Sequence, residues 1–280
     1  MNKELQHKVD QSVKFLRKMG EVYDGTFEVC YSGGKDSDVI LELAKMAGIK
    51  YRAIYKNTTI DPAGTIKHVI ERGVEIVQPK KTFFQLIAER GFPTRMVRFC
   101  CQELKEYKIL DKAIIGVRRE ESTARRERYH EPTQCRFYGS KKEHVEAIYP
   151  ILDWTTQDVA EFLQWRGVKC APVYYDKNGV FHPERRLGCM ACPLSTNQLA
   201  EFKQHPKLVR AWLRAGKKRF ENAPPDTSLR RKYNNVYEIF VMSYFYNSER
   251  EFREATSGMF GGYDCKKALE EYFGINLDID

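Results

Sequence analysis

The chain has 280 residues, of which 42% are hydrophobic, and its formal net charge is +9 at pH 7. This length allows one large or two small domains, and the apolar content is ordinary for a globular core. No apolar run reaches the roughly eighteen residues that a membrane-spanning helix needs, and the charged start Met1–Glu4 is unlike a secretory signal. We therefore expect a cytoplasmic protein with no membrane contact.

The positive charge favours a polyanionic partner such as nucleic acid, although excess Lys and Arg also simply solvate a surface. The sequence contains eight cysteines. In a reducing compartment they are expected to be metal ligands, catalytic thiols or buried side chains rather than disulfides.

The first segments in chain order are a helix and a strand. Apolar residues at helical spacing between Leu5 and Met19 predict an amphipathic helix over residues 3–19, to which we assign no chemistry. The apolar run 27–31 predicts a strand, two glycines follow it, and a second helical pattern begins immediately afterwards. Residues 27–44 therefore predict a strand, a tight turn and a helix.

This turn has the composition of an anion site. Glycines allow backbone N–H groups to turn inward, a helix N-terminus adds partial positive charge, and hydroxyl and ammonium groups suit phosphate oxygens. The spacing is not that of a Walker loop. A glycine turn with a helix cap at Asp36 or Ser37 is the alternative interpretation. The candidate nucleotide-binding residues are Ser32, Gly33, Gly34, Lys35, Asp36 and Ser37.

Short strands then alternate with helices, which predicts an α/β fold with a doubly wound, mainly parallel sheet. The expected strands are residues 51–55, 75–77, 113–117 and 145–152. The expected helices are residues 65–72, 83–89, a segment that begins after residue 98 and ends near Asp111, and 153–166.

Ligands of such sheets bind beyond the carboxyl ends of the strands, so the loops there are candidate sites. Asn57 and Asp61 follow the second strand and could contact a nucleotide, or could instead cap the next helix around Pro62. The loop 118–126 follows the fourth strand and is rich in arginine and hydroxyl groups. Arg118, Arg119 and Arg125 could neutralise phosphate or sulfate there.

The later part of the chain is irregular over 172–193 and then mainly helical. We expect an N-terminal helix over 1–25, a nucleotide-binding domain over 26–193 and a helical region over 194–280. Aromatic residues between 233 and 262 are expected to be core rather than interface. One basic stripe is predicted from Lys203, Lys207, Arg210, Arg214 and Lys217 or Lys218, extended by Arg230, Arg231 and Lys232.

Four cysteines form two close pairs, Cys100–Cys101 and Cys189–Cys192. Two such pairs make a four-sulfur set that suits zinc or an iron–sulfur cluster. Adjacent cysteines diverge, which favours the separated irons of a [4Fe-4S] cluster over a single zinc ion. The same pattern would also arise from a redox dithiol or from thiols that are buried by coincidence. Cys135 is a plausible substitute ligand.

The run from Ser32 to Ser37 resembles the PP-loop of the adenine nucleotide alpha hydrolase superfamily at every position. The chain also resembles the phosphoadenosine phosphosulfate (PAPS) reductase family over about residues 26–194, a family similar to adenylylsulfate (APS) reductases and DNA phosphorothioation sulfurtransferases. The matching residues are Ser32 to Ser37; Arg98 with Cys100, Cys101, Leu104 and Lys105; Gly116 to Ser122 with Arg125; Pro150 with Asp153, Trp154, Asp158 and Val159; and Gly188, Cys189 and Cys192.

This resemblance implies that the loop holds the pyrophosphate of ATP during attack on the alpha phosphate. It also implies that the four paired cysteines hold a [4Fe-4S] cluster and that the arginine loop receives a phosphate or sulfate. Sulfonucleotide reductases carry a C-terminal Glu-Cys-Gly-Leu-His segment, which this chain lacks. Cys265 lies in the corresponding terminal region in a different context. The intact Gly33–Asp36 stretch is the form expected where pyrophosphate must be held.

Three functions follow from these observations. The first is an ATP pyrophosphatase, assisted by Mg2+, which adenylates a substrate for cluster-dependent sulfur transfer to nucleic acid. The second is a thiol-dependent reductase that converts APS or PAPS to sulfite, with Cys265 as the nucleophile. Either enzyme could need a partner protein as sulfur donor or thiol reductant. The third is a nonenzymatic nucleotide and redox sensor.

Overall fold

The structure is a computed structural model that describes residues 1–138, 143–257 and 263–279. The chain divides into two compact units, each built from two stretches of sequence. Unit 1 comprises Met1–Pro79 and Gln102–Cys189, and unit 2 comprises Lys80–Cys101 and Met190–Asp280. Residues 80–101 thus group with the C-terminal helices, while the domain limits inferred from the sequence stay a prediction. In the part of the chain that is described, no helix is long and apolar enough to cross a membrane.

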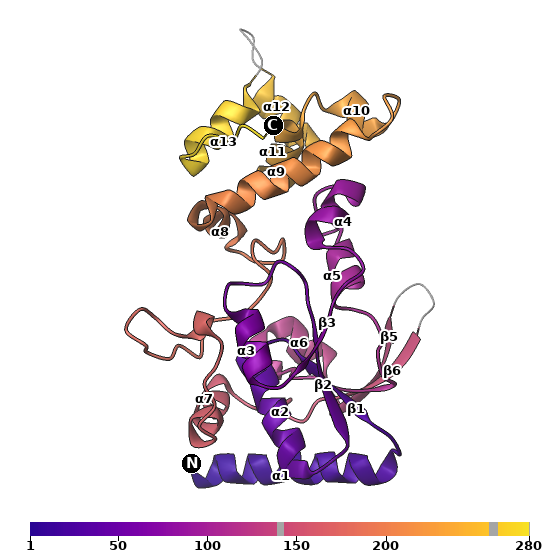
Figure 1. Ribbon diagram of the computed structural model, residues 1–280, viewed down its shortest axis with the longest axis vertical. Helices are drawn as coiled ribbons and strands as arrows, with labels where there is room; N and C mark the ends of the chain where they lie inside the picture. The colour runs from indigo at the N-terminus through magenta and orange to yellow at the C-terminus, as the bar shows by residue number, and fades with distance from the viewer. Residues whose placement is uncertain (139–142, 258–262, 280) are drawn as a thin grey trace. The chain divides into compact units, whose positions relative to one another are not determined.

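Unit 1 is built on a six-stranded sheet with the order β3-β2-β1-β4-β6-β5. All neighbouring strands are parallel except β5 and β6, which are antiparallel. The α/β class and the mainly parallel sheet predicted from the sequence are therefore confirmed (Figure 1). The strands are β1 Phe27–Tyr31, β2 Tyr51–Lys56, β3 Glu75–Val77, β4 Lys112–Ile114, β5 Thr133–Tyr138 and β6 Glu143–Ile148.

One face of this sheet carries the main apolar core. Phe27, Val29 and Tyr31 of β1 point to the same face because alternate strand residues share a side, and all three are buried. The apolar stripe of α1 and the buried residues of α2 and α7 pack in the same cluster. The helical segments of unit 1 are α1 Lys3–Val22, α2 Lys35–Ala47, α3 Thr65–Glu71, η1 Arg119–Glu121, α6 Thr123–Arg128, α7 Thr156–Trp165 and η2 Pro172–Tyr174.

Several sequence predictions need correction at the ends of elements. The fourth strand stops at Ile114 rather than at residue 117, and the strand expected over 145–152 spans Glu143–Ile148. The helix α5, Phe99–Leu104, ends well before Asp111. The edge strand β5 was not predicted, because its burial pattern is mostly exposed and gives little apolar signal.

Unit 2 is helical, and aromatic side chains fill its core. Trp212 packs edge-on against Phe202 with ring centroids 5.2 Å apart, and Phe202 also contacts Phe240. Phe240 is fully buried, so the core assignment of this aromatic residue is confirmed. The helices are α4 Phe83–Arg90, α8 Gln198–Gln204, α9 Pro206–Glu221, α10 Ser228–Lys232, α11 Val236–Phe245, α12 Glu249–Thr256 and α13 Cys265–Phe273 (Figure 1).

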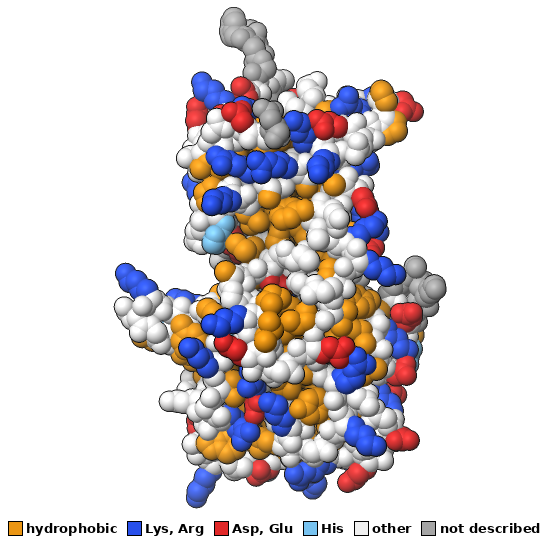
Figure 2. Space-filling model, in the orientation of Figure 1, with side chains coloured by type: hydrophobic (Ala, Val, Ile, Leu, Met, Phe, Trp, Pro, Cys, Tyr) orange, Lys and Arg blue, Asp and Glu red, His pale blue; other side chains and the backbone are white. Residues whose placement is uncertain are grey.

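The predicted basic stripe is interrupted. α8 ends at Gln204 and α9 begins at Pro206, so Lys203 lies on a different helix from the rest of the set. Proline cannot continue the preceding helix, which explains the break. On α9, Lys207, Arg214 and Lys218 are exposed. Figure 2 shows Lys and Arg side chains in a row over the part of unit 2 that carries α9.

A buried polar network ties α2 to the strands and helices around it. Asp38 is fully buried, and its carboxylate accepts a hydrogen bond of 2.6 Å from the Tyr31 hydroxyl. The Asp38 carboxylate also lies 3.1 Å from both His68 Nε2 and Arg72 Nε. Arg72 continues to Glu42 at 2.6 Å, and Glu42 in turn binds Arg166 of the α7 C-cap at 2.9 Å. Every charge in this network therefore has a partner, as buried charges require.

Glu42 makes this network sensitive to acid. Burial alone raises its pKa, but hydrogen bonds from Lys45, Arg166 and Arg72 outweigh burial and lower the pKa from 4.5 to about 2. Because the folded-state pKa is the lower one, Glu42 stabilises the fold above about pH 4.5. That contribution disappears as the pH falls toward about 2.

Replacement of Glu42 by Gln should lower the free energy of unfolding at pH 7 by about 2 kcal/mol. The loss should shrink as the pH is lowered from 4.5 toward 2, because the wild-type carboxylate is then protonated as well. Urea denaturation at several pH values measures both effects. Glu71→Gln, which removes an exposed pair with Lys67, is the matched control and should cost less than about 0.5 kcal/mol. An equal loss at pH 3 and pH 7 would contradict this account.

Candidate active site at the carboxyl edge of the sheet

The strand order of the sheet reverses between β1 and β4. From β1 the chain proceeds to β2 and β3 on one side, and then returns to form β4 on the other side of β1. In open parallel sheets, ligands bind where the strand order reverses, beyond the carboxyl ends of the strands. The loop Ser32–Gly34 after β1 and the segment 115–118 after β4 flank this point.

Two glycines are required by the geometry of these loops. Gly33 has φ of +78°, a left-handed conformation that side chains rarely adopt. A Cβ atom on Gly116 would lie 2.9 Å from the backbone oxygen of Asp36, so only glycine allows the two loops to approach so closely. The strand, turn and helix predicted over residues 27–44 are confirmed.

The polar groups of the loop after β1 form hydrogen bonds with other residues of unit 1. The Ser37 hydroxyl donates to the Gly34 carbonyl at 2.7 Å, and the Ser32 hydroxyl donates to Ser37 Oγ at 3.3 Å. The Lys35 amide donates to the Tyr174 hydroxyl at 3.1 Å. These contacts fix the loop, and the direct contact of Ser32 and Ser37 with phosphate stays a prediction.

The ammonium group of Lys35 is held beside the loop. Its side chain is only 5% exposed, and Nζ lies 3.2 Å from Asp36 Oδ2. Nζ also lies 5.6 Å from the centroid of the Tyr174 ring, within range of a cation–π attraction. A buried cation with a single neighbouring carboxylate at the start of a helix is suited to an anionic ligand.

Arg118 joins the two loops. Its side chain is 2% exposed, and Nε lies 2.6 Å from Asp36 Oδ1. Its Nη1 binds Glu120 at 2.8 Å and the Thr156 hydroxyl at 3.3 Å. In this structure the Arg118 guanidinium is occupied by protein partners and holds the Asp36 carboxylate in place. Direct contact of Arg118 with phosphate or sulfate stays a prediction.

The other two predicted arginines differ from each other. Arg119 donates from Nε to the Tyr129 carbonyl at 2.8 Å and pairs with Asp153, so it braces the loop. Arg125 pairs with Glu121, whose other carboxylate oxygen lies 2.8 Å from Arg186 Nη2. Burial and the neighbouring charge of Arg186 lower the pKa of the Arg125 guanidinium. These two partly exposed arginines share one carboxylate and could accept a further anion.

The loop after β2 is held by its own polar side chains. Asn57 Oδ1 accepts from the Thr59 amide at 2.8 Å, and Asp61 accepts from the Tyr55 hydroxyl and from the Thr58 amide. The N-cap of α3 is Gly64, which makes no side-chain cap bond. The interpretation that Asn57 and Asp61 cap this helix is therefore wrong: they fold the loop instead.

Cys189 lies at the same edge of unit 1. Its thiol interacts with Lys105, Asp61 and Thr58. Burial raises the pKa of this thiol and the charge of Asp61 raises it further, whereas Lys105 and the hydrogen bond with Thr58 lower it. One of the four paired cysteines is thereby placed beside the loop that follows β2.

The other three paired cysteines, Cys100, Cys101 and Cys192, belong to unit 2. Arg95 Nε donates to the carbonyl of Pro193 at 3.2 Å, which joins the segment before one pair to the residue after the other. Ala191, inside the Cys189–Cys192 turn, has φ of +50°. Glu201 of α8 holds this turn, because its carboxylate accepts from the Ala191 amide at 2.6 Å.

The cysteines are thiols without disulfide bonds throughout the described residues. Within that part of the chain, no three His, Cys, Asp or Glu side chains are arranged as a metal site. Cys135 is exposed on β5. Cys265 is buried at the start of α13, and burial together with Glu238 and Asp264 raises its pKa to about 11.

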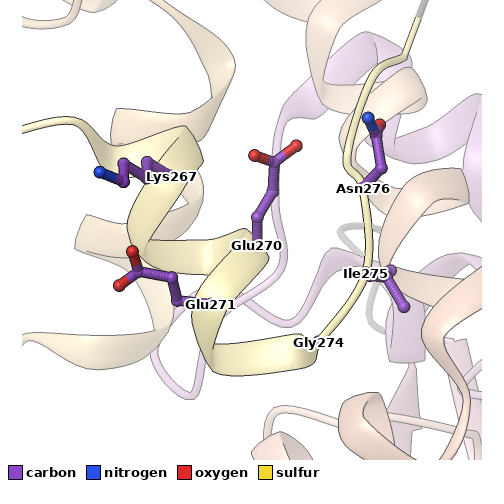
Figure 3. Close-up of a pocket in the computed structure, with 6 residues that line it drawn as sticks. All are labelled: Lys267, Glu270, Glu271, Gly274, Ile275 and Asn276. Atoms are coloured by element: carbon purple, nitrogen blue, oxygen red, sulfur yellow. The ribbon is translucent and has the colours of Figure 1, made fainter.

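A shallow, open pocket of about 360 Å³ lies on the surface of unit 2, between α13 and the chain that follows it (Figure 3). Figure 3 shows the Glu270 carboxylate pointing toward this space. Glu270 Oε1 accepts a hydrogen bond from the Leu277 amide at 2.8 Å, so this side chain ties the segment after α13 to the helix. A pocket with this acidic lining is unsuited to phosphate. The lining residues are Lys267, Glu270, Glu271, Gly274, Ile275 and Asn276.

Residues 26–195 match the family model of the phosphoadenosine phosphosulfate reductase domain. The match covers more than half of the chain, so the protein belongs to this family, as the sequence resemblance indicated.

Individual relatives share less than a third of their residues with this chain. An uncharacterized protein of Methanocaldococcus jannaschii is 28% identical over 73% of this chain and 53% of its own length. Sulfate adenylyltransferase subunit 2 of Shewanella baltica is 24% identical over 61% of this chain and 67% of its own length. The chain spans about half the length of the first of these relatives. A solved PAPS reductase from Candida auris aligns with a TM-score of 0.45 and 13% identity, over 69% of this chain and 97% of that chain.

The positioning role of Arg118 is testable by Arg118→Lys. Lysine keeps the charge but cannot bind Asp36, Glu120 and Thr156 together, so the free energy of unfolding should fall by about 3 kcal/mol. Arg126→Lys, at an exposed position of α6, is the control and should change it by less than about 0.5 kcal/mol. Chemical denaturation measures both variants. An Arg118→Lys protein as stable as wild type would contradict the positioning role.

Proposed function

We propose that the protein is an ATP pyrophosphatase that adenylates a substrate and prepares it for sulfur transfer. The observation that carries this proposal is the complete Ser32–Ser37 loop at the point where the strand order reverses. The close packing of Gly116 against Asp36 and the Asp36–Arg118 ion pair hold this loop against the loop after β4. Membership of the phosphoadenosine phosphosulfate reductase domain family supports the same conclusion.

In the proposed reaction, an oxygen atom of the acceptor attacks the α-phosphorus of ATP. A new phosphorus–oxygen bond forms, the bond from the α-phosphorus to the α–β bridging oxygen breaks, and pyrophosphate leaves with that electron pair. Lys35 is positioned to stabilise charge on the leaving group, because its ammonium is buried beside the loop. Mg2+ is expected to accompany the nucleotide, and Arg125 with Arg186 could bind a second anionic group.

The adenylated acceptor then has a good leaving group. Hydrosulfide, supplied by a partner or donor, can attack the activated carbon while the carbon–oxygen bond breaks and AMP departs. Sulfur keeps its oxidation state in this exchange, so the transfer needs no external oxidant. The substituted carbon ends as a thiol or thione.

The four paired cysteines are the proposed ligands of a [4Fe-4S] cluster, which would supply a sulfur-binding or redox centre. The donor set fits this cofactor because soft thiolates are its preferred ligands. The Arg95–Pro193 hydrogen bond and the Glu201–Ala191 hydrogen bond support the segments that carry Cys100, Cys101 and Cys192.

Nucleic acid is the proposed acceptor. The supporting observations are the net charge of +9 and the exposed Lys207, Arg214 and Lys218 on α9. Basic side chains that bind phosphates release counterions, so such binding weakens as salt rises.

The alternative reductase needs a reactive cysteine near the C-terminus. Cys265 is buried and its pKa is raised to about 11, which leaves little thiolate at neutral pH. This environment favours a packing role for Cys265 and disfavours the release of sulfite from APS or PAPS.

Purified protein should release pyrophosphate from ATP, and Lys35→Met should slow that release by about 100-fold or more. Lys50→Met, at an exposed position before β2, is the control and should keep the wild-type rate. Addition of RNA or DNA as acceptor should stimulate release at low salt and lose its effect at high salt. Production of sulfite from APS or PAPS without pyrophosphate release from ATP would overturn the proposal in favour of the reductase.

Anaerobically purified protein should contain about four iron and four sulfide ions per chain, as one [4Fe-4S] cluster requires. Cys192→Ser should remove most of both, whereas Cys135→Ser should retain them because Cys135 is exposed on β5. Metal analysis with a sulfide assay measures the contents. Zinc in place of iron, or a wild-type protein without either metal, would contradict the assignment of the cluster.

A further inference from the structure

A buried hydroxyl beside the first loop lacks a hydrogen-bond partner. Thr65, the first residue of α3, is 1% exposed, and its Oγ1 has no partner among the described residues. Folding normally pairs buried hydroxyls, because a donor removed from water without a partner destabilises the fold. Valine has nearly the same shape without that cost, so a threonine here calls for an explanation.

The position of Thr65 points to the loop. A Cβ atom built on Gly33 would lie 3.0 Å from Thr65 Cγ2, so the methyl group of Thr65 lies against the loop, and the hydroxyl is bonded to the same Cβ atom. A Cβ on the preceding Gly64 would lie 2.8 Å from Pro172 Cγ. Thr65 therefore lies against the loop after β1, and its chain neighbour Gly64 lies against Pro172 at the start of η2.

The hydrogen bonds of the loop explain why an additional donor is useful there. The Ser37 hydroxyl is used by the Gly34 carbonyl, and the Ser32 hydroxyl is used by Ser37. The Lys35 amide, which at a helix start would ordinarily face an anion, is used by the Tyr174 hydroxyl. Thr65 Oγ1 differs from these groups because its hydrogen-bonding capacity is unused in the described residues.

We infer that the Thr65 hydroxyl is a ligand-binding donor, which pairs with a phosphate oxygen of the adenine nucleotide held at Gly33. This inference rests on the proposed function, because it concerns the same nucleotide. It adds a contact from the segment after β2 to a site otherwise formed by the loops after β1 and β4. The hydroxyl thus gains its partner when the nucleotide binds.

The test is Thr65→Val, which removes the hydroxyl and keeps the shape. The dissociation constant for ATP, measured by titration calorimetry, should rise about tenfold. The melting temperature without nucleotide should stay equal to wild type or rise, because an unpaired buried hydroxyl has been removed. Thr65→Ser, which keeps the hydroxyl, should bind ATP more tightly than Thr65→Val.

Thr58→Val provides the contrast. Thr58 is equally buried, but its hydroxyl accepts from the Ile60 amide at 3.4 Å and interacts with Cys189. This variant should therefore lower the melting temperature without nucleotide, whereas Thr65→Val should not.

Three results would overturn the inference. If wild-type protein binds ATP and Thr65→Val binds it equally well, the hydroxyl is not a ligand donor, although the proposed function stands. If Thr65→Val melts several degrees lower without nucleotide and keeps its ATP affinity, the hydroxyl has a structural partner. A wild-type protein that binds neither ATP, APS nor PAPS would reject the proposed function itself, and the inference with it.

Discussion

The ion pair between Asp36 and Arg118 is the interaction on which the candidate site depends. It joins the helix that follows β1 to the loop that follows β4, across the point where the strand order reverses. Arg118 is buried, so its charge is tolerable only because Asp36, Glu120 and Thr156 surround it. Gly116 permits the same approach sterically. Charge pairing and close packing thus hold the two loops together.

The polar network around Asp38 and Glu42 holds the same helix, α2, further along its length. Asp38 and Glu42 lie one turn apart on α2 and are bound by Arg72 and Arg166 from neighbouring segments. Such networks fix one arrangement of helices, because any shift would leave a buried charge unpaired. The orientation of α2, and with it the position of Lys35 at the helix start, is therefore determined by polar contacts as well as by the apolar core.

The sequence was informative where chemistry and local pattern coincide. The Ser32–Ser37 run combines a strand, a left-handed glycine and a helix start, so both the local fold and the candidate ligand could be predicted. It was uninformative where partners are distant along the chain. The contact of Tyr174 with Lys35 joins residues far apart in sequence within an irregular segment. Arg186 could likewise be identified only after folding brought it to Glu121.

The arginine-rich loop 118–126 also shows what the sequence alone could not predict. Its composition predicted anion binding for Arg118, Arg119 and Arg125 alike, because a sequence shows charge but not burial. Folding separates them: Arg118 and Arg119 brace the loop, and Arg125 remains partly exposed beside Arg186. The exposed edge strand β5 escaped prediction for a related reason, since its pairing with β6 involves the backbone rather than an apolar pattern.

The central claim is that an adenine nucleotide binds at the loops after β1 and β4, where the strand order reverses. Hydrogen–deuterium exchange of backbone amides, with and without ATP and Mg2+, tests it most directly. The account predicts slower exchange in the presence of ATP over residues 32–38 and 115–121, with little change along the exposed strand β5. Unchanged exchange in both loops under saturating ATP, with protection elsewhere in the chain, would contradict it.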